Sequence, residues 1–289
     1  MYCMISEIKK SLYIPFFIIS CVGVVFICLL SEGYTSASGK SYTIFELLLS
    51  LRRDVMFVDI FLNRYEIWMK GIGVWTQLLL PFLLSIGYLS VVSGEKQKGM
   101  NRLLLIRENN LKYSISKVFS AMLSGGIIMF VGYLLFGLVV YAKFPSIQEY
   151  SKNDLNRYLE FYQGFHQDFH EVSFCFSRCV DVFLYGMCVN IFAYLVSIFF
   201  TDKYILFCLP IMLKYIWGQA VIKIELDAMN KGQETLLNLC AVFRVENILN
   251  RNSSVYWVTS LLFIFAVYLL GLHLHMYLLR KRGDGFGLD

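Results

Sequence analysis

The sequence predicts an all-α membrane protein with six transmembrane helices, both termini in the cytoplasm and short amphipathic helices in the outer loops. Three observations support this fold class. Of the 289 residues, 57% are hydrophobic and only 16% are charged, whereas soluble domains carry about 25% charged residues. The apolar residues gather in runs of about 20, the length that crosses a bilayer. Positive charge is concentrated on alternate connections between these runs.

Six windows are long and apolar enough to cross a bilayer. Each should be helical, because backbone polar groups in lipid must bond to one another. The best is the last, which has no formal charge over 25 residues. The weakest is the fifth, which contains Pro210 and Lys214. The windows are residues 12–30, 72–93, 118–141, 180–200, 204–222 and 255–279.

The distribution of lysine and arginine predicts the orientation of these spans. The N-terminal tail, the 94–117 loop, the 201–203 turn and the C-terminal tail hold 12 of these residues in 48 positions. The other three connections hold 13 in 111 positions, less than half that density. Cytoplasmic connections are the positive ones. We therefore expect one membrane domain over residues 1–289, in the plasma membrane, with both termini and the 94–117 loop inside.

The outer connections contain apolar stretches that are too short to cross a bilayer. Residues 42–71 mix such stretches with charged side chains, and residues 223–250 resemble one or two short amphipathic helices. Segments of this kind lie along the membrane surface or pack against the spans. The net charge of +5 follows from the cytoplasmic positive flanks, and we predict no nucleic-acid partner.

The segment SGEKQKGMNRLLLIR, residues 93–107, places Gly94 and Gly99 five residues apart, as in a phosphate-binding loop. A working loop reads G-x-x-x-x-G-K-[ST], because its lysine reaches the phosphates and its hydroxyl binds Mg²⁺. Met100 and Asn101 occupy those two positions. We therefore predict no nucleotide site, no catalytic residue and no cofactor on this chain.

The same segment contains a second pattern, in which Glu95, Gly99, the pair Leu103-Leu104, Arg107 and Lys117 follow one another. This order resembles the cytoplasmic loop between the second and third spans of the type-2 ABC exporter permeases. Members of that family commonly carry there a glutamate, a glycine, a leucine pair, a basic residue and a lysine that opens the next span. Six spans with cytoplasmic termini also resemble this family.

The resemblance implies that the loop forms a short helix that docks into a cleft on a separate ATPase subunit, which would bind ATP and Mg²⁺. Apolar anchors inside a charged rim suit such docking. A simpler interpretation stays open, because any loop between two spans carries charge where it meets the cytoplasm. The docking residues implied are Glu95, Lys98, Gly99, Met100, Arg102 and Leu103.

The expected function is then that of a membrane-spanning subunit in an ATP-driven exporter. Its partners would be the ATPase, membrane lipid and a second permease, either a copy of itself or a related chain. Aromatic residues make up 17% of the chain, which suits an amphipathic substrate such as a peptide, lipid-like molecule or drug. A non-transporting sensor or immunity partner is one alternative. An intramembrane enzyme is another, although no glutamate lies inside any predicted span.

Lys214 is a candidate pathway residue, because an ionisable group in the middle of a span costs about 2.5–3.5 kcal/mol and is a functional hypothesis by default. Its side chain could face the substrate path, or it could extend along the helix to the outer surface.

Histidines and cysteines elsewhere offer weaker candidates. His273 and His275 lie two residues apart, so they should point to different faces of the last span and are poor co-ligands. Cys175 and Cys179 are one helical turn apart, and either two separate thiols or a pair remains open. We predict no metal site.

Overall fold

The computed structural model describes residues 9–10, 14–35, 39–50, 60–97, 110–146, 149, 171–200, 202–232 and 254–284. This part of the chain is mostly helical. Each of the six predicted windows overlaps one helix, so the helical assignment is confirmed for all six. These helices are α2 (Ile14–Leu29), α6 (Val74–Gln97), α8 (Asn110–Lys143), α10 (Glu171–Phe199), α11 (Lys203–Asn230) and α13 (Ser254–Asp284).

Within the described residues, three stretches of helix are long and apolar enough to cross a membrane: Leu111–Lys143, Arg178–Ser197 and Tyr204–Asn230. Shorter apolar helices cover Pro15–Leu29, Leu78–Leu89 and Leu261–Tyr277. These lengths are compatible with a membrane protein. Six crossings and cytoplasmic termini remain predictions.

One helix continues into a connection that was expected to hold separate short helices. The fifth window was expected to end at residue 222 and to be followed by separate short helices, but α11 continues without interruption to Asn230. Residues 223–230 are rich in strong helix formers such as Lys, Glu, Leu, Ala and Met, and no glycine or proline interrupts them before Gly232. Gly232 adopts a left-handed φ of 63° just beyond the helix end, where helices commonly terminate. The rest of that connection, residues 233–250, lies outside the described residues.

The chain divides into two compact units, each built from segments that are distant in sequence. Unit 1 comprises Met1–Ser20, Leu80–Met129 and Asp181–Asp289. Unit 2 comprises Cys21–Leu79 and Phe130–Val180. The candidate site described below belongs to unit 1.

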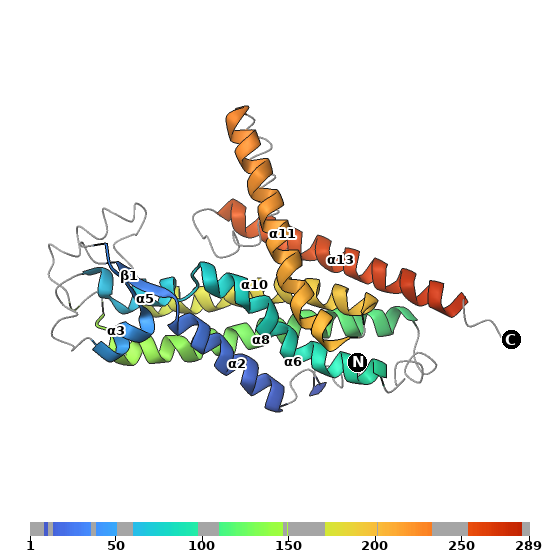
Figure 1. Cartoon of the computed structure of the whole chain (residues 1–289), viewed down its shortest axis with the longest axis horizontal. Helices are drawn as coiled ribbons and strands as arrows, with labels where there is room; N and C mark the ends of the chain where they lie inside the picture. The colour runs from blue at the N-terminus through green and yellow to red at the C-terminus, as the bar shows by residue number, and fades with distance from the viewer. Residues whose placement is uncertain are drawn as a thin grey trace. The chain divides into compact units, whose positions relative to one another are not determined.

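Unit 2 contains a small antiparallel hairpin that the all-α prediction did not include. Strand β1 (Glu32–Thr35) pairs with β2 (Ser41–Thr43), and three short helical segments follow, as Figure 1 shows for α3 and α5. These segments are α3 (Ile44–Ser50), η1 (Ile60–Leu62) and α5 (Arg64–Lys70). The short helices agree with the expectation for the outer connection 42–71.

Local sequence explains where α3 and α5 begin. Thr43 and Glu46 form a reciprocal capping box, in which each side chain accepts a hydrogen bond from the other residue's backbone N–H at 3.2 and 2.9 Å. Asn63 caps α5 by accepting from the Glu66 N–H at 2.8 Å. Helix α5 then packs through Trp68 against α8, where the Tyr133 hydroxyl donates to the Trp68 carbonyl at 2.8 Å.

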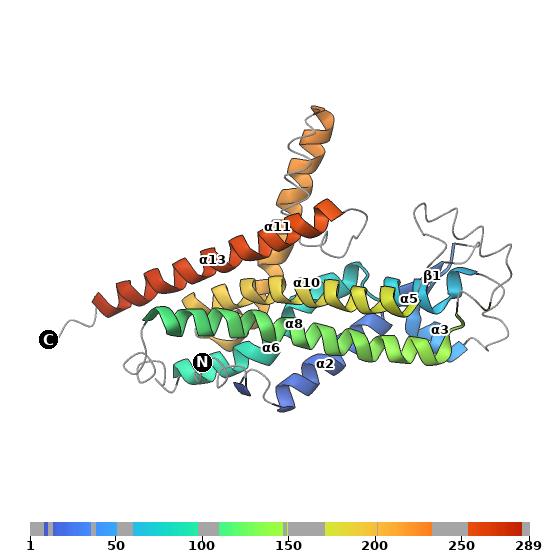
Figure 2. The same cartoon turned by 180° about the vertical axis from the view of Figure 1, so that it is seen from behind.

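The parts of α8 and α10 that belong to unit 1 lie side by side, as both Figure 1 and Figure 2 show. Glycine allows this approach. A Cβ placed on Gly186 of α10 would lie 2.6 Å from the Gly125 carbonyl oxygen of α8, and a Cβ on Gly125 would lie 2.6 Å from the Gly186 carbonyl oxygen. Such separations are far below ordinary contact, so neither position tolerates a side chain without movement. The glycines of the third window therefore mark a close helix contact, as small residues do in membrane helices.

Candidate functional site

The candidate site begins with the carboxylate of Glu95, near the C-terminal end of α6. Its side chain is only 7% exposed and forms an ion pair with the ammonium of Lys117 on α8, whose side chain is 3% exposed. The Lys10 ammonium donates to the other carboxylate oxygen at 2.8 Å. We call these three residues the Glu95 cluster. It joins the N-terminal segment, the end of α6 and the beginning of α8.

The charge state of Glu95 follows from its surroundings. Burial alone raises the pKa of a carboxyl group, but the charge of Lys117 and the hydrogen bonds from Lys10 and Lys117 outweigh burial and hold the pKa of Glu95 below its ordinary value. Glu95 is therefore ionised at neutral pH. A buried carboxylate in this state requires its partners, because removing one partner of a buried pair leaves an uncompensated charge.

Aromatic side chains connect the Glu95 cluster to two further helices. The Lys117 ammonium lies 5.7 Å from the ring centre of Tyr113, and the Tyr113 ring lies 5.9 Å from that of His275 on α13. The Nε2 atom of His275 is 3.3 Å from the hydroxyl of Tyr194 on α10. One continuous set of contacts thus spans α6, α8, α10 and α13.

The loop that was expected to dock a partner begins and ends at the Glu95 cluster. Glu95 lies two residues before Gln97, where the described part of α6 ends, and α8 resumes at Asn110. The remaining implied docking residues, Lys98, Gly99, Met100, Arg102 and Leu103, lie outside the described residues. The structure thus places Glu95 inside the protein, where its carboxylate pairs with Lys10 and Lys117 of the same chain.

Sequence reasoning did not find the role of Lys10, and it noted Lys117 only through the family resemblance. A local pattern could not show it, because Lys10 is 85 residues from Glu95 and Lys117 is 22 residues away. The one available signal was that each of the three charged groups stands next to an apolar window. The prediction that His273 and His275 point to different faces is confirmed, since His275 is buried and His273 is exposed.

A second polar group lies at the contact between α8 and α10. The side-chain amide of Asn190 is fully buried and donates to the Ala121 carbonyl at 2.6 Å and to the Ser124 hydroxyl at 3.1 Å. These bonds lie directly beside the Gly125–Gly186 contact. These hydrogen bonds help to orient two helices that the glycines allow to approach closely. We interpret them as structural.

Lys214 lies near the middle of α11, and its ammonium donates to the hydroxyl of Tyr185 on α10. The same ammonium is 5.1 Å from the centre of the Tyr185 ring. The side chain therefore turns toward a neighbouring helix; whether Lys214 lines a substrate path or reaches the outer surface stays a prediction. Tyr185 is fully buried, so the charged end of Lys214 is held within unit 1.

Of the two cysteines singled out above, Cys179 is buried in α10, and the side chain of Cys175 lies outside the described residues. Comparisons with protein-family models, with curated proteins and with solved structures found no match for this chain. Functional inference therefore rests on the residues and contacts described above.

Proposed function

We propose that this chain is the membrane-spanning subunit of an ATP-driven exporter of the type-2 ABC kind, moved by a separate ATPase that engages the 98–107 part of the loop. The observation that supports the proposal best is the Glu95 cluster. It connects both ends of that loop to one buried ion pair. A force applied to the loop would therefore act on α6 and α8 together.

The chemistry of the loop supports the same role. Residues 98–107 combine three positive charges, on Lys98, Arg102 and Arg107, with the apolar side chains of Met100, Leu103, Leu104, Leu105 and Ile106. Buried apolar anchors with a charged rim are the usual composition of a protein interface. Because the Glu95 carboxylate is occupied within the chain, we assign docking to the residues that follow it and a mechanical role to Glu95.

In this mechanism the partner's ATP-driven movement displaces the loop. The Glu95–Lys117 pair transmits that displacement to the ends of α6 and α8, and the contacts of Tyr113, His275 and Tyr194 pass it to α10 and α13. A change in helix packing would then alternate the exposure of a substrate path. ATP and Mg²⁺ belong to the partner, and a second permease chain completes the path.

The test is co-purification of the tagged chain from its native membrane, with bound proteins identified and assayed for ATP hydrolysis. We expect an ATPase with a complete phosphate-binding loop to accompany the parent chain. The double variant Arg102→Glu/Leu103→Asp should lose most of it, because charge reversal and a buried carboxylate both oppose docking. Lys112→Glu is the matched control, since Lys112 is exposed in the first turn of α8 and lies outside the docking residues.

Equal recovery of the ATPase with the double variant would show that this loop is not the docking site. Recovery of no ATPase at all with the parent chain would favour a sensor or immunity partner. ATP hydrolysis by the purified chain alone would contradict the proposal completely.

A further inference from the structure

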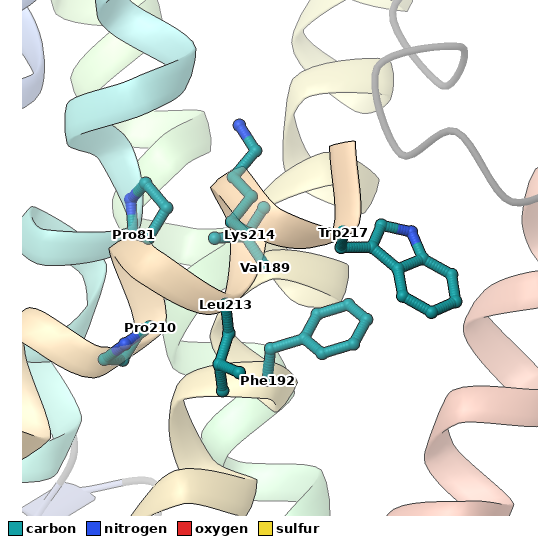
Figure 3. A pocket seen from close by; sticks show the side chains of 7 residues that line it. All are labelled: Pro81, Val189, Phe192, Pro210, Leu213, Lys214 and Trp217. Atoms are coloured by element: carbon teal, nitrogen blue, oxygen red, sulfur yellow. The ribbon is translucent and has the colours of Figure 1, made fainter. Parts of the chain in front are cut away.

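Helix α11 packs against its neighbours in unit 1 mainly along one side. Figure 3 shows this side of the helix, which borders a small pocket shared with α6 and α10. The residues that line the pocket are Pro210, Leu213, Lys214 and Trp217 of α11, with Pro81, Val189 and Phe192 from the other two helices. The opposite side is open, because only 17% of the most apolar stretch of α11 is buried, compared with 56% for α8 and 67% for α10.

The open side of α11 carries residues at heptad spacing. Nine residues, or two and a half helical turns, separate Pro210 from Gln219, so Gln219 lies on the side opposite the pocket. Positions at alternating steps of four and three residues share one side of a helix. Six of the seven such positions are exposed, and Ile222 is half-buried. We call these residues the α11 seam: Cys208, Met212, Tyr215, Gln219, Ile222, Leu226 and Met229.

The α11 seam stays apolar where the rest of the helix becomes charged. Lys223, Glu225 and Asp227 follow the predicted span, and none of them occupies a seam position. Leu226 and Met229 lie among these charges and are 55% and 61% exposed. Lipid covers apolar side chains within the bilayer, but an apolar stripe that continues between charged residues is typical of a contact with another protein.

Gln219 is the only amide in the α11 seam. Its side chain is exposed and makes no hydrogen bond to the part of the chain that the structure describes. An amide without a partner is costly in lipid, and membrane helices use Asn and Gln side chains to form hydrogen bonds to one another. A single polar residue among apolar heptad positions also fixes the register of two paired helices.

The chemistry of the α11 seam fits a second copy of the same chain. An amide both donates and accepts hydrogen bonds, so Gln219 can bond to Gln219 of the partner subunit. A charged residue would repel its own copy, and the seam contains none. Copies of one chain insert into a membrane with the same orientation. Two α11 helices would therefore meet as a parallel pair about a two-fold axis, where each seam residue faces its own copy.

We propose that two copies of this chain pair through the α11 seam, with Gln219 hydrogen-bonded to Gln219 of the partner subunit. This inference deepens the proposed function and rests on it for its purpose, because it identifies the second permease as a copy of the same chain. Helix α11 then contacts α6 and α10 on one side and the partner subunit on the other. A movement of α6 or α10 would pass through α11 to the second copy.

Cys208 provides a probe of this pairing in the native protein. Among the described cysteines it is the exposed one, and in a parallel pair it faces Cys208 of the partner subunit. Isolated membranes that contain the chain are treated with copper phenanthroline, which joins thiols within disulfide distance, or with a short bismaleimide, which spans a longer gap. Dimers are separated on a denaturing gel, and mass spectrometry identifies the joined chains and residues.

Single cysteines along α11 test the position of the seam. The background has serine in place of the cysteines that are exposed or whose side chains lie outside the described residues, namely Cys3, Cys175, Cys208 and Cys240. We expect the parent to cross-link through Cys208 and the background variant Gln219→Cys to cross-link at least about fivefold more than Ala220→Cys or Ile224→Cys. Ala220 and Ile224 are matched controls, because both are exposed on α11 outside the seam.

A second measurement tests the role of the amide. Donor-labelled and acceptor-labelled chains are reconstituted into liposomes at increasing ratios of lipid to protein, and energy transfer reports their pairing. Gln219→Leu should lower the ratio at half-maximal transfer about threefold to tenfold, because a hydrogen bond between membrane helices contributes roughly that factor. Ala220→Leu places the same side chain one position along the helix and should behave as the parent does.

Equal cross-linking of Gln219→Cys and Ala220→Cys would overturn the proposal. So would a lack of dimers in both the parent and Gln219→Cys, which would mean that lipid covers the seam, or cross-linking to a different protein. Equal pairing of Gln219→Leu and the parent would overturn the assigned hydrogen bond. If a variant does not elute as a monodisperse protein, Cys208 of the parent decides.

The outcomes also separate this inference from the proposed function. Dimers joined through the seam without a co-purifying ATPase would leave the pairing in place and reject the exporter. A co-purifying ATPase with chains that do not cross-link to each other would do the reverse.

Discussion

Glu95 is the residue at which a single substitution should have its largest effect on stability. Glu95→Gln keeps the size of the side chain but removes its charge, and it leaves the ammonium of Lys117 buried without its anion. Breaking a buried pair in this way costs about 3–5 kcal/mol. We expect a correspondingly large drop in the unfolding midpoint of the purified protein in detergent, measured by tryptophan fluorescence on heating.

Three further variants separate this loss from a general effect of mutation. The double variant Glu95→Gln/Lys117→Met removes both buried charges and should be more stable than Glu95→Gln alone. Lys10→Met should lose about 1 kcal/mol or less, since its side chain is 32% exposed, and Lys9→Met should lose nothing because Lys9 is exposed. If Glu95→Gln melts together with Lys9→Met, the Glu95 cluster does not stabilise the fold.

The same carboxylate gives stability a defined dependence on pH. The pKa of Glu95 in the folded protein lies below its ordinary value of 4.5. Its contribution is therefore complete above about pH 4.5, declines as the pH falls through that value, and is lost once the pH passes below the folded pKa.

This dependence is measured as the difference in unfolding midpoint between the parent and Glu95→Gln. The difference should stay constant from about pH 7 to pH 5 and shrink in more acidic buffer. A difference that grew as the pH fell would mean that the folded state favours the protonated acid, contrary to the ion pair.

The partners of individual side chains were the feature that the sequence predicted least well. Glu95 was identified as a docking residue and Lys214 as a charge within a predicted span, but their partners were not. The glutamate was expected on a surface that meets an ATPase, and the lysine was thought able to extend to the membrane surface. Both side chains bind residues on other helices. Spacing along one helix contains no information about such partners, because they depend on how separate helices pack.

The contact between α8 and α10 leads to a prediction at the scale of helices. Gly186→Ala should destabilise the protein by about 1–3 kcal/mol, because the new methyl group would meet the Gly125 carbonyl and the side chain of Met129. Gly218→Ala on α11 is the matched control, with nothing within 4 Å of the added atom. Alanine is the better helix former, so this control should be neutral or slightly stabilising.

The two glycine variants are compared by their unfolding midpoints in the same detergent. Equal midpoints would mean that α8 and α10 are not in close contact at this point.

Helix existence was far more predictable than helix length. Runs of about 20 apolar residues were predicted to be helical because a bilayer would require it, and a helix lies at each of the six runs. The lengths differed because helices continue past the apolar stretch wherever the flanking residues favour helix. Helix α8 begins at Asn110, eight residues before its predicted window, and α11 extends eight residues beyond its window. The β1–β2 hairpin escaped prediction because its strands are only four and three residues long.

At the scale of the whole molecule, the orientation in the membrane is the prediction on which the proposed function depends. The distribution of lysine and arginine predicts that the 98–109 connection lies in the cytoplasm. The Glu95 cluster lies where α6 ends and α8 begins, at the two ends of this connection. An ATPase in the cytoplasm can contact this connection only if the connection lies on the cytoplasmic side of the membrane.

Single cysteines at Asn101 and at Asn153 test the orientation in intact cells. A membrane-impermeant maleimide should label Asn153→Cys directly and Asn101→Cys only after the membrane is permeabilised. The parent chain provides the background from its eight native cysteines, and the described ones other than Cys208 are buried. Labelling of Asn101→Cys in intact cells would place the loop outside, beyond the reach of ATP. The ATPase would then have no surface to engage, and the exporter proposal would fail whatever the contacts of Glu95.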